Sequence, residues 1–249
     1  MKILVINPNT TMSMTHAIAN ACEKVAQSTT EIVAVSPKRG PRSIEGYVED
    51  YVAAVATLET ILANRGRYDA YVIACYGDPG LHAARELVEE PVIGIAEASM
   101  HMACLVAHKF SIVSVLHRIR PMLEDMVKLE GFSERCASVR TTELAVLDIE
   151  EDYEQAEKML IAESRRAMEI DGAEAICLGC AGMGPLDKGM QAALGIPVLD
   201  GCGCAIKMAE ACFDYGIQTS KFKAFKEPEP KEYLQWPQFD QVSRLAEAR

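Results

Sequence analysis

Two cysteines stand at matching places in the two halves of the chain, within segments that repeat one another. Residues 70–81 read AYVIACYGDPGL and residues 175–186 read AICLGCAGMGPL, so each half has an apolar run followed by Cys75 or Cys180. A glycine follows each cysteine after two residues, and a leucine after six. A lone cysteine is ordinarily a small buried residue, but the matched placement of this pair favours a shared functional role.

Two thiols on opposite sides of a cleft are suited to proton transfer at one carbon. If one is a thiolate and the other a thiol, the first removes a proton from one face and the second delivers a proton to the other. Such a pair racemises a stereocentre beside a carbonyl. We expect Cys75 and Cys180 to lie where strands lead into helix N-termini, because the N–H groups there lower a thiol's pKa and stabilise an oxyanion.

The elements that position the two cysteines alternate between strand-like and helix-like segments, as in α/β folds with parallel sheets. The duplication predicts two pseudo-symmetric Rossmann-like lobes with mainly parallel sheets and an active site between them. The first lobe is predicted to take residues 1–97 and about 206–249, and the second residues 98–205. The predicted strands are 2–6, 31–35, 69–74, 92–95, 110–115, 137–140, 174–178 and 197–199. The predicted helices are 12–27, 45–64, 80–89, 97–107, 119–130, 151–170, 186–194 and 203–215.

Further candidate site residues follow from the rule that ligands bind beyond the carboxyl ends of parallel strands. The turn after the opening strand holds Asn9, whose amide can bond carbonyls and ring N–H groups or cap the next helix. Ser114 follows the corresponding strand of the second half. Gly77 and Gly182 allow the backbone to come close to a ligand.

The loop at residues 36–47, SPKRGPRSIEGY, enters a helix from the same edge of the predicted sheet. In it, Ile44 and Tyr47 either wall a small site or pack against the start of that helix. The chain has no GxGxxG motif, no P-loop and no lysine in a setting typical of pyridoxal phosphate. We therefore expect neither a cofactor nor a bound metal.

Composition favours a protein that acts on small molecules. The net charge of −11 over 249 residues disfavours nucleic acid, and no apolar run approaches the roughly 18–20 residues of a membrane span. Nine cysteines, with no secretion signal in the opening segment MKILVINPNTT, are typical of reduced thiols. We therefore expect a cytoplasmic protein that binds neither nucleic acid nor membrane. The proline-containing tail at 226–239 is expected to be extended and to dock, with a neighbouring subunit as one candidate.

Taken together, these motifs resemble those of the hydantoin and allantoin racemases of the aspartate/glutamate racemase superfamily. The resemblance runs from residue 2 to about residue 224 and is carried by VINPNT, SIEGY, ACYGDPGL around Cys75, PVIGIAEA and LGCAGM around Cys180. It implies a homo-oligomer and cofactor-independent catalysis with Cys75 and Cys180 as the two bases. It also implies a pocket lined by Asn9, Tyr76, Gly77, Ser114, Ala181 and Gly182.

The residues after the cysteines point to a class of substrate. Amino-acid racemases of the superfamily follow their cysteines with Asn-Thr or Thr-His, which hold the ammonium and carboxylate of the substrate. Here Tyr76-Gly77 and Ala181-Gly182 stand in their place, so a free amino acid is disfavoured. A neutral cyclic ureide, such as a 5-substituted hydantoin or allantoin, needs no salt bridge, and its ring carbonyls acidify the α-hydrogen.

Other interpretations stay open at this point. Some relatives use one or both cysteines to decarboxylate a malonate, to isomerise a diacid between cis and trans forms, or to racemise an amino acid. A two-lobed small-molecule binding protein without turnover has no need of matched thiols. A thiol–disulfide protein would use Cys177 and Cys180, but Cys177 falls within an apolar strand, where it is expected to be buried.

Overall fold

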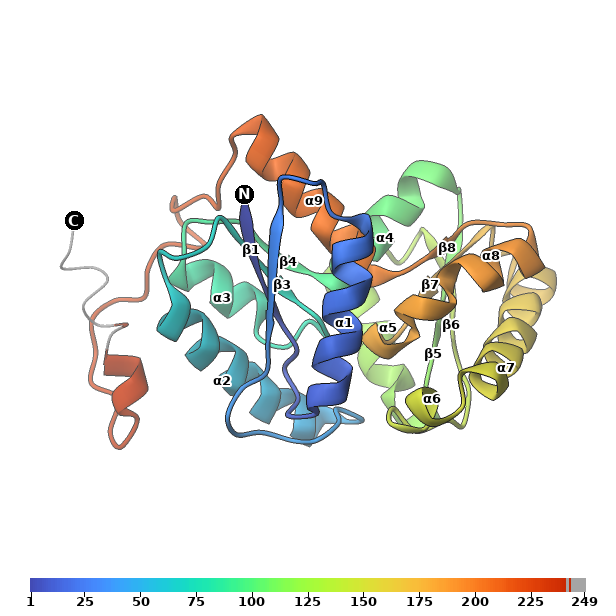
Figure 1. Ribbon diagram of the computed structural model, residues 1–249, viewed down its shortest axis with the longest axis horizontal. Coiled ribbons are helices and arrows are strands. Elements are labelled where there is room, and N and C mark those ends of the chain that lie inside the picture. The colour runs from blue at the N-terminus through green and yellow to red at the C-terminus, as the bar shows by residue number, and fades with distance from the viewer. Residues whose placement is uncertain (241, 243–249) are drawn as a thin grey trace.

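The computed structural model describes residues 1–240 and 242, and within them it contains two four-stranded parallel sheets covered by helices (Figure 1). The strand order is β2-β1-β3-β4 in the first sheet and β6-β5-β7-β8 in the second, so the two sheets have the same topology. The first sheet comprises β1 (Lys2–Ile6), β2 (Glu31–Val35), β3 (Ala70–Ile73) and β4 (Val92–Gly94). The second comprises β5 (Phe110–Ser114), β6 (Cys136–Thr141), β7 (Ala175–Leu178) and β8 (Val198–Leu199). The predicted α/β class with two lobes is confirmed.

Helices cover both sheets and match the sequence-based expectations to within about two residues at their ends. The α-helices are α1 (Met12–Val25), α2 (Tyr47–Asn64), α3 (Leu81–Leu87), α4 (Ile95–Val106), α5 (Arg120–Leu129), α6 (Asp148–Glu151), α7 (Tyr153–Arg166), α8 (Asp187–Leu194) and α9 (Gly201–Tyr215). The shorter helical turns are η1 (His117–Ile119), η2 (Ala167–Asp171), η3 (Ala181–Leu186) and η4 (Pro237–Phe239). The helix predicted at 151–170 is α7 continued by η2, and α6, η1, η3 and η4 were not expected.

The alternation of side chains along β1 places apolar residues on both faces of the first sheet. Ile3 and Val5 belong to one buried cluster, whereas Leu4 and Ile6 belong to a second, as the period of two in a strand requires. The first of these clusters continues into the other lobe, where it includes Leu178 of β7. The two lobes therefore share one continuous apolar core.

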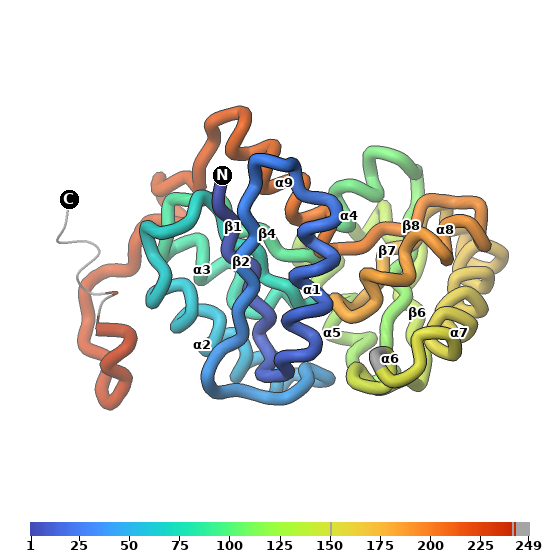
Figure 2. Tube along the Cα trace, viewed as in Figure 1, coloured from blue at the N-terminus to red at the C-terminus, as the bar shows by residue number. Residues whose placement is uncertain are grey.

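The last helix of each lobe packs across the boundary between the lobes. Helix α4 follows the first sheet but contacts β5, β7 and β8 of the second, while α9 follows the second sheet and contacts β3, β4 and α1. Figure 2 shows α1, α4 and α9 in the space between the two sheets. The two helices meet at their first residues, because a Cβ on Gly201 would lie only 2.7 Å from the carbonyl oxygen of Ile95. This crossing fixes how the carboxyl edges of the two sheets face each other.

The tail after α9 packs against the first lobe of its own chain. The ammonium of Lys221 donates to the carbonyl oxygens of Arg85 and Glu86 at the end of α3, and the amide of Gln238 donates to Glu59 on α2 at 2.6 Å. Within the segment predicted to dock, Gln238 thus contacts α2, while Lys221, just before that segment, contacts α3. The proposed lobe boundaries at about 97 and 206 stay a prediction, and residues 241 and 243–249 of that first lobe lie outside the described residues.

Among the described residues, no helix combines the length and the apolar character that crossing a bilayer requires.

Candidate active site

The two matched cysteines occupy equivalent places beyond the central strands of the two sheets. Strand β3 ends at Ile73 and β7 at Leu178, and the cysteine comes two residues after the end of the strand in both lobes. Cys75 and Cys180 are both partly buried and both line one small cavity between the lobes. About 40 Å³ of this cavity is accessible to the centre of a water molecule. The topology therefore brings together two thiols that are 105 residues apart in the sequence.

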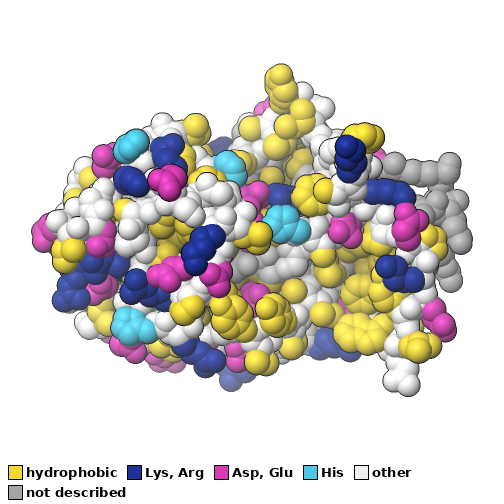
Figure 3. All heavy atoms as spheres, turned by 180° about the vertical axis from the view of Figure 1, so that it is seen from behind, with side chains coloured by type: hydrophobic (Ala, Val, Ile, Leu, Met, Phe, Trp, Pro, Cys, Tyr) yellow, Lys and Arg dark blue, Asp and Glu magenta, His cyan; other side chains and the backbone are white. Residues whose placement is uncertain are grey.

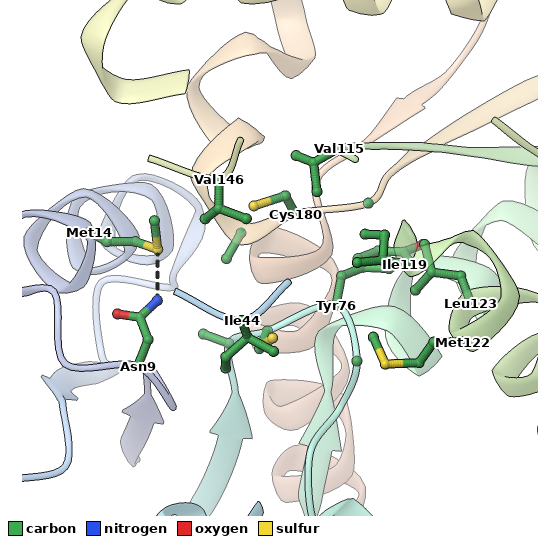
Figure 4. Close-up of a pocket in the computed structure, with 15 residues that line it drawn as sticks. Asn9, Met14, Ile44, Tyr76, Val115, Ile119, Met122, Leu123, Val146 and Cys180 are labelled. Atoms are coloured by element: carbon green, nitrogen blue, oxygen red, sulfur yellow. Dashed lines mark hydrogen bonds between the residues drawn. The ribbon is translucent and has the colours of Figure 1, made fainter. Parts of the chain in front are cut away.

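One end of the cavity is polar and is formed by Asn9 (Figure 4). The side-chain oxygen of Asn9 accepts hydrogen bonds from Asn7 Nδ2 and from the backbone N–H of Thr11, both at 2.9 Å. These bonds turn the Asn9 amide nitrogen toward Met14, whose sulfur it contacts at 3.1 Å. A thioether is a weak acceptor, so this N–H group can readily be redirected to a carbonyl or an oxyanion inside the cavity.

The other end of the cavity is apolar. Ile119, Met122 and Leu123 lie on the opposite side of the cavity from Asn9 in Figure 4. Ile119 ends η1 and the other two begin α5, so one helical turn supplies this wall. Methionine has a flexible, polarisable side chain that adapts to ligands of different shape.

The environment of Cys75 differs from the sequence-based expectation. Burial raises the pKa of the Cys75 thiol well above its ordinary value, the backbone N–H of Gly77 opposes this rise, and the charge of Asp50 adds to it. The predicted lowering of the pKa is therefore wrong for this thiol. The reason is that the chain makes a turn after Cys75, with Asp78 at a φ of 46°, and α3 begins only at Leu81.

Cys180 does stand at the start of a helix, as predicted. It is the N-cap residue of η3, and η3 passes directly into α8. The first N–H groups of a helix have no partner inside the helix. In η3 these are the N–H groups of Ala181 and Gly182, the two residues that follow the thiol. The two halves, although similar in sequence, give their cysteines different electrostatic surroundings.

An aspartate connects each cysteine loop to the helix that begins after the next strand. In the first half the aspartate belongs to the cysteine loop, and in the second half it immediately precedes the helix. In the first lobe, the Asp78 carboxylate accepts hydrogen bonds from the N–H groups of Ala96 and Glu97 at the start of α4. A Cβ on Gly94 would lie 2.2 Å from the Asp78 carboxyl carbon, so only glycine fits there.

In the second lobe the aspartate follows the strand, and a glycine stands in the cysteine loop one residue beyond the position equivalent to Asp78. Asp200, at the position equivalent to Gly94, caps α9 by accepting from the N–H groups of Cys202 and Gly203. It lies against Gly184 in the Cys180 loop, where a Cβ would be 3.1 Å from Asp200 Oδ1. Both cysteine loops are therefore held by an aspartate at a helix N-terminus. Burial raises the pKa of both carboxyl groups, and the hydrogen bonds that they accept from the backbone N–H groups oppose this rise.

Tyr76 fixes the Cys75 loop to the core. Its hydroxyl lies 2.7 Å from the hydroxyl of Ser99 on α4 and also forms a hydrogen bond with the thiol of Cys177 on β7. The side chain is buried at 3% exposure and crosses from one lobe to the other. Tyr76 thus lines the cavity while its polar end is fully engaged in the core.

The sequence matches the Asp/Glu/Hydantoin racemase family over residues 3–209. The chain belongs to this family. The hydantoin racemase of Pseudomonas sp. (strain NS671) is 51% identical over 235 residues, which cover 94% of each chain. That of Paenarthrobacter aurescens is 42% identical over 94% of this chain and 100% of its own. The structure of the allantoin racemase from Klebsiella pneumoniae superposes with a TM-score of 0.93 at 43% identity, covering 97% of this chain and 98% of that one. The protein is therefore an isomerase of the racemase type.

Most of the site residues predicted from the sequence come together in this racemase. Those that line the cavity are Asn9, Ile44, Cys75, Tyr76, Gly77, Cys180 and Ala181. Ser114 lies behind the wall, where its hydroxyl donates to the carbonyl oxygen of Gly179 at 2.6 Å. Tyr47 lies in a neighbouring groove with 44% of its surface exposed. Gly182 is adjacent to the cavity, since a Cβ there would lie 3.9 Å from the sulfur of Cys180.

Sequence reasoning identified Ile44 but missed the other large apolar side chains of the cavity. Val115 directly follows β5, and Val146 lies in the loop after β6, so both sit beyond the carboxyl ends of strands. The rule that identified Asn9 and Ser114 applies to them as well. Met14, Ile119 and Met122 lie on helices, where their spacing is the same as that of residues packed in the core, and no sequence signal separates the two roles.

The neighbouring thiol Cys177 is not part of the cavity lining. It is fully buried in β7, and burial raises the pKa of its thiol well above the ordinary value. Within residues 1–240 and 242, no three His, Cys, Asp or Glu side chains gather in a way that could hold a metal ion.

Proposed function

We propose that this racemase inverts C5 of 5-substituted hydantoins, with Cys75 and Cys180 as the two bases and without a cofactor. The observation that carries the proposal is the presence of both thiols on one cavity, one from each lobe. The hydantoin racemases at 51% and 42% identity support the substrate class.

The reaction requires two proton transfers and no change of oxidation state. The thiolate takes the proton from C5, and the electron pair left on carbon is delocalised into the adjacent ring carbonyl as an enolate. The opposing thiol then gives its proton to the other face of C5, so that the two cysteines end with exchanged protonation states. General acid and base thus exchange roles with the handedness of the substrate.

The polar end of the cavity suits the enolate oxygen. Within the described residues, the amide nitrogen of Asn9 has only a thioether as partner. A donor aimed at developing negative charge stabilises the transition state more than the ground state. The first N–H groups of η3, after Cys180, lie at the same edge of the sheet. A neutral ring needs no charged side chain for binding, which agrees with an apolar lining around Asn9.

The apolar end of the cavity favours an aliphatic or aromatic substituent at C5. Ile119, Met122 and Leu123 offer no hydrogen-bond donor for a polar group. The ureido group of allantoin would lose its hydrogen bonds to water on entering this end, and that desolvation is costly without replacement partners. Allantoin is nevertheless the second candidate substrate, because the allantoin racemase structure is so similar.

The test is deuterium exchange at C5 in D₂O, followed by NMR and circular dichroism with no cofactor added. The substrates are both enantiomers of 5-benzylhydantoin and 5-isobutylhydantoin, together with allantoin. We expect exchange with loss of optical activity, faster for the two hydantoins than for allantoin. Faster turnover of allantoin would assign the second candidate, and exchange at the uncatalysed rate with every ureide would rule out both.

Two further properties belong to the proposal. We expect the protein to self-associate, because Tyr47, Val48, Tyr51 and Val52 at the start of α2 are all at least 44% exposed. We expect it to act in the cytoplasm, since none of the nine cysteines, all of them described, forms a disulfide bond. Light scattering after size exclusion gives the mass in solution, and fractionation of the source cell gives the compartment.

A further inference from the structure

A partly buried carboxylate lies directly behind the loop that carries Cys75. Asp50 is in the first turn of α2, and a Cβ on Gly77 would lie only 2.6 Å from its Oδ1 atom. The missing side chain at Gly77 therefore allows this carboxylate to touch the cysteine loop. Any larger residue at position 77 would displace the carboxylate.

The position of the Asp50 carboxyl group is not explained by a hydrogen bond to its buried oxygen among the described residues. Within the described residues, Asp50 Oδ1 is buried and has no hydrogen-bond partner. Burial raises the pKa of Asp50 to about 6, so the carboxyl group is still ionised at neutral pH and above. An unpartnered buried charge destabilises a fold, which suggests a role other than packing.

Asp50 lies in a groove that adjoins the active-site cavity. Gly77 and Met122 line both spaces, so they form the partition between them. Figure 3 shows the molecule from behind, where the surface is recessed between the two lobes and hydrophobic side chains lie around the recess. The other titratable groups that line the groove are Tyr47, Tyr51, Asp78, His82, Asp125 and Glu130.

Among the charges near the Cys75 thiol, that of Asp50 has the largest effect on its pKa, ahead of Cys180 and Asp78. All three act in the same direction, because a negative charge opposes the formation of a second one nearby. Asp78 is committed to capping α4, whereas Asp50 caps nothing in its own helix, whose N-cap is Gly46.

We propose that Asp50 is a positioning residue that acts on Cys75 through its negative charge and keeps Cys75 in the thiol form, so that Cys180 provides the thiolate in the resting enzyme. The part concerning Cys180 rests on the proposed two-cysteine mechanism. The asymmetry of the two loops supports this assignment, because Cys180 stands at a helix start and Cys75 does not. The proposal thus gives the two equivalent thiols of a duplicated fold different roles before substrate binds.

The experiment measures the alkylation of each cysteine by iodoacetamide, without substrate, between pH 6 and pH 10. Mass spectrometry of the tryptic peptides gives separate rates for Cys75 and Cys180. In the wild type we expect Cys180 to react faster than Cys75 at pH 8. In Asp50→Asn we expect the rate at Cys75 at pH 8 to rise about tenfold, as follows from a drop of about one unit in its pKa, with a much smaller change at Cys180.

Two variants separate the charge from the shape of the side chain. Asp125→Asn removes the same charge from the same groove, but Asp125 is exposed and paired with Lys128, so the rate at Cys75 should stay within about twofold of wild type. Asp50→Glu keeps the charge and should leave Cys75 as unreactive as in the wild type. Thermal unfolding followed by circular dichroism checks that each variant is folded.

An unchanged rate at Cys75 in folded Asp50→Asn would overturn the role of Asp50. Faster alkylation of Cys75 than of Cys180 in the wild type would overturn the assignment of the thiolate. Because these rates are measured without turnover, they are independent of the substrate. The expected rates together with no racemisation of any ureide would mean that the proposed function fails while the role of Asp50 stands.

Discussion

Glu45 of the first lobe accepts a hydrogen bond from the backbone N–H of Val146 in the second lobe, with 3.0 Å between Oε1 and N. Ile44, next to Glu45, and Val146 itself both line the cavity. The bond therefore joins two walls of the cavity that come from residues 101 positions apart in the sequence. A link of this kind holds the two walls in place on either side of the cavity.

Removal of this link should weaken substrate binding with little effect on the fold. We expect Glu45→Ala to raise KM about three- to tenfold, because a hydrogen bond to a charged group contributes about 1.5–3 kcal/mol and part of this is recovered by water. Glu45→Gln keeps the acceptor and should behave almost as the wild type. Glu143→Ala, in the same loop as Val146 but paired with His117, is the control. A wild-type KM in Glu45→Ala would show that this hydrogen bond does not contribute to substrate binding.

Each cavity cysteine should be indispensable for racemisation. We expect Cys75→Ser and Cys180→Ser to lower kcat at least about 100-fold, since a serine hydroxyl is a far weaker acid than a thiol and supplies no anionic base at neutral pH, and general acid–base catalysis contributes about 10²–10⁴-fold. The unfolding temperature should stay close to that of the wild type. Cys212→Ser, a partly exposed thiol on α9, is the matched control and should retain full activity. Normal turnover in either cavity variant would exclude the two-base mechanism.

The apolar wall of the cavity should set the preference for the C5 substituent. We expect Met122→Ala to increase kcat/KM for 5-benzylhydantoin relative to 5-methylhydantoin by about tenfold, because a pocket enlarged by a few methylenes discriminates by about 1–3 kcal/mol. Met126→Ala, one turn further along α5 and outside the cavity lining, should leave the ratio unchanged. Equal ratios in the two variants would remove Met122 from substrate selection.

Much of the fold was predictable because the pattern of apolar residues within each segment matches the way that segment packs in the structure. The apolar strands and the periodic helices of this chain could each be recognised from their neighbours in sequence, as for Ile3 to Ile6 in β1. The positions of Cys75 and Cys180 followed from one rule about the carboxyl ends of parallel strands. The same rule, applied to β5 and β6, would have included Val115 and Val146.

The rest of the site depends on contacts between distant segments, which a single sequence does not display. Asp50 and Gly77 are 27 residues apart and meet only because α2 packs beside the loop after β3. The pKa of Cys75 was predicted in the wrong direction, because burial of the thiol raises it and the turn at Asp78 separates the thiol from the start of α3. Repetition in sequence suggested equal thiols, whereas the backbone after each one differs.

The two glycines that contact the capping aspartates, Gly94 and Gly184, should differ in how well they tolerate replacement by alanine. We expect Gly94→Ala to destabilise the protein by about 3 kcal/mol or more, because its Cβ would lie 2.2 Å from the Asp78 carboxyl carbon and would break the cap on α4. The equivalent change Gly184→Ala leaves 3.1 Å to Asp200 and should cost about 1 kcal/mol. Urea denaturation gives both values. Equal losses of unfolding free energy in the two variants would contradict the closer contact of Asp78 with Gly94 than of Asp200 with Gly184.

The charge of Asp50 should also be visible in the pH dependence of stability. Its pKa is about 6 in the folded protein, compared with an ordinary value of 3.8. Between these values the folded state holds a proton that the unfolded state has lost. The carboxyl therefore destabilises the fold progressively as pH rises from about 4 to 6, and the full penalty remains above pH 6.

Asp50→Asn removes this penalty, so the variant should be more stable than the wild type at pH 8 and equally stable near pH 4. We expect a gain of about 1 kcal/mol at pH 8, after allowance for the partial exposure of the side chain, which corresponds to about 2–4 °C in the unfolding temperature. Thermal unfolding at pH 4, 6 and 8 measures the gain, with Asp125→Asn as the exposed control. A variant less stable than the wild type at pH 8 would mean that the Asp50 carboxylate has a stabilising partner, and its tenfold effect on Cys75 alkylation would then need a different physical cause.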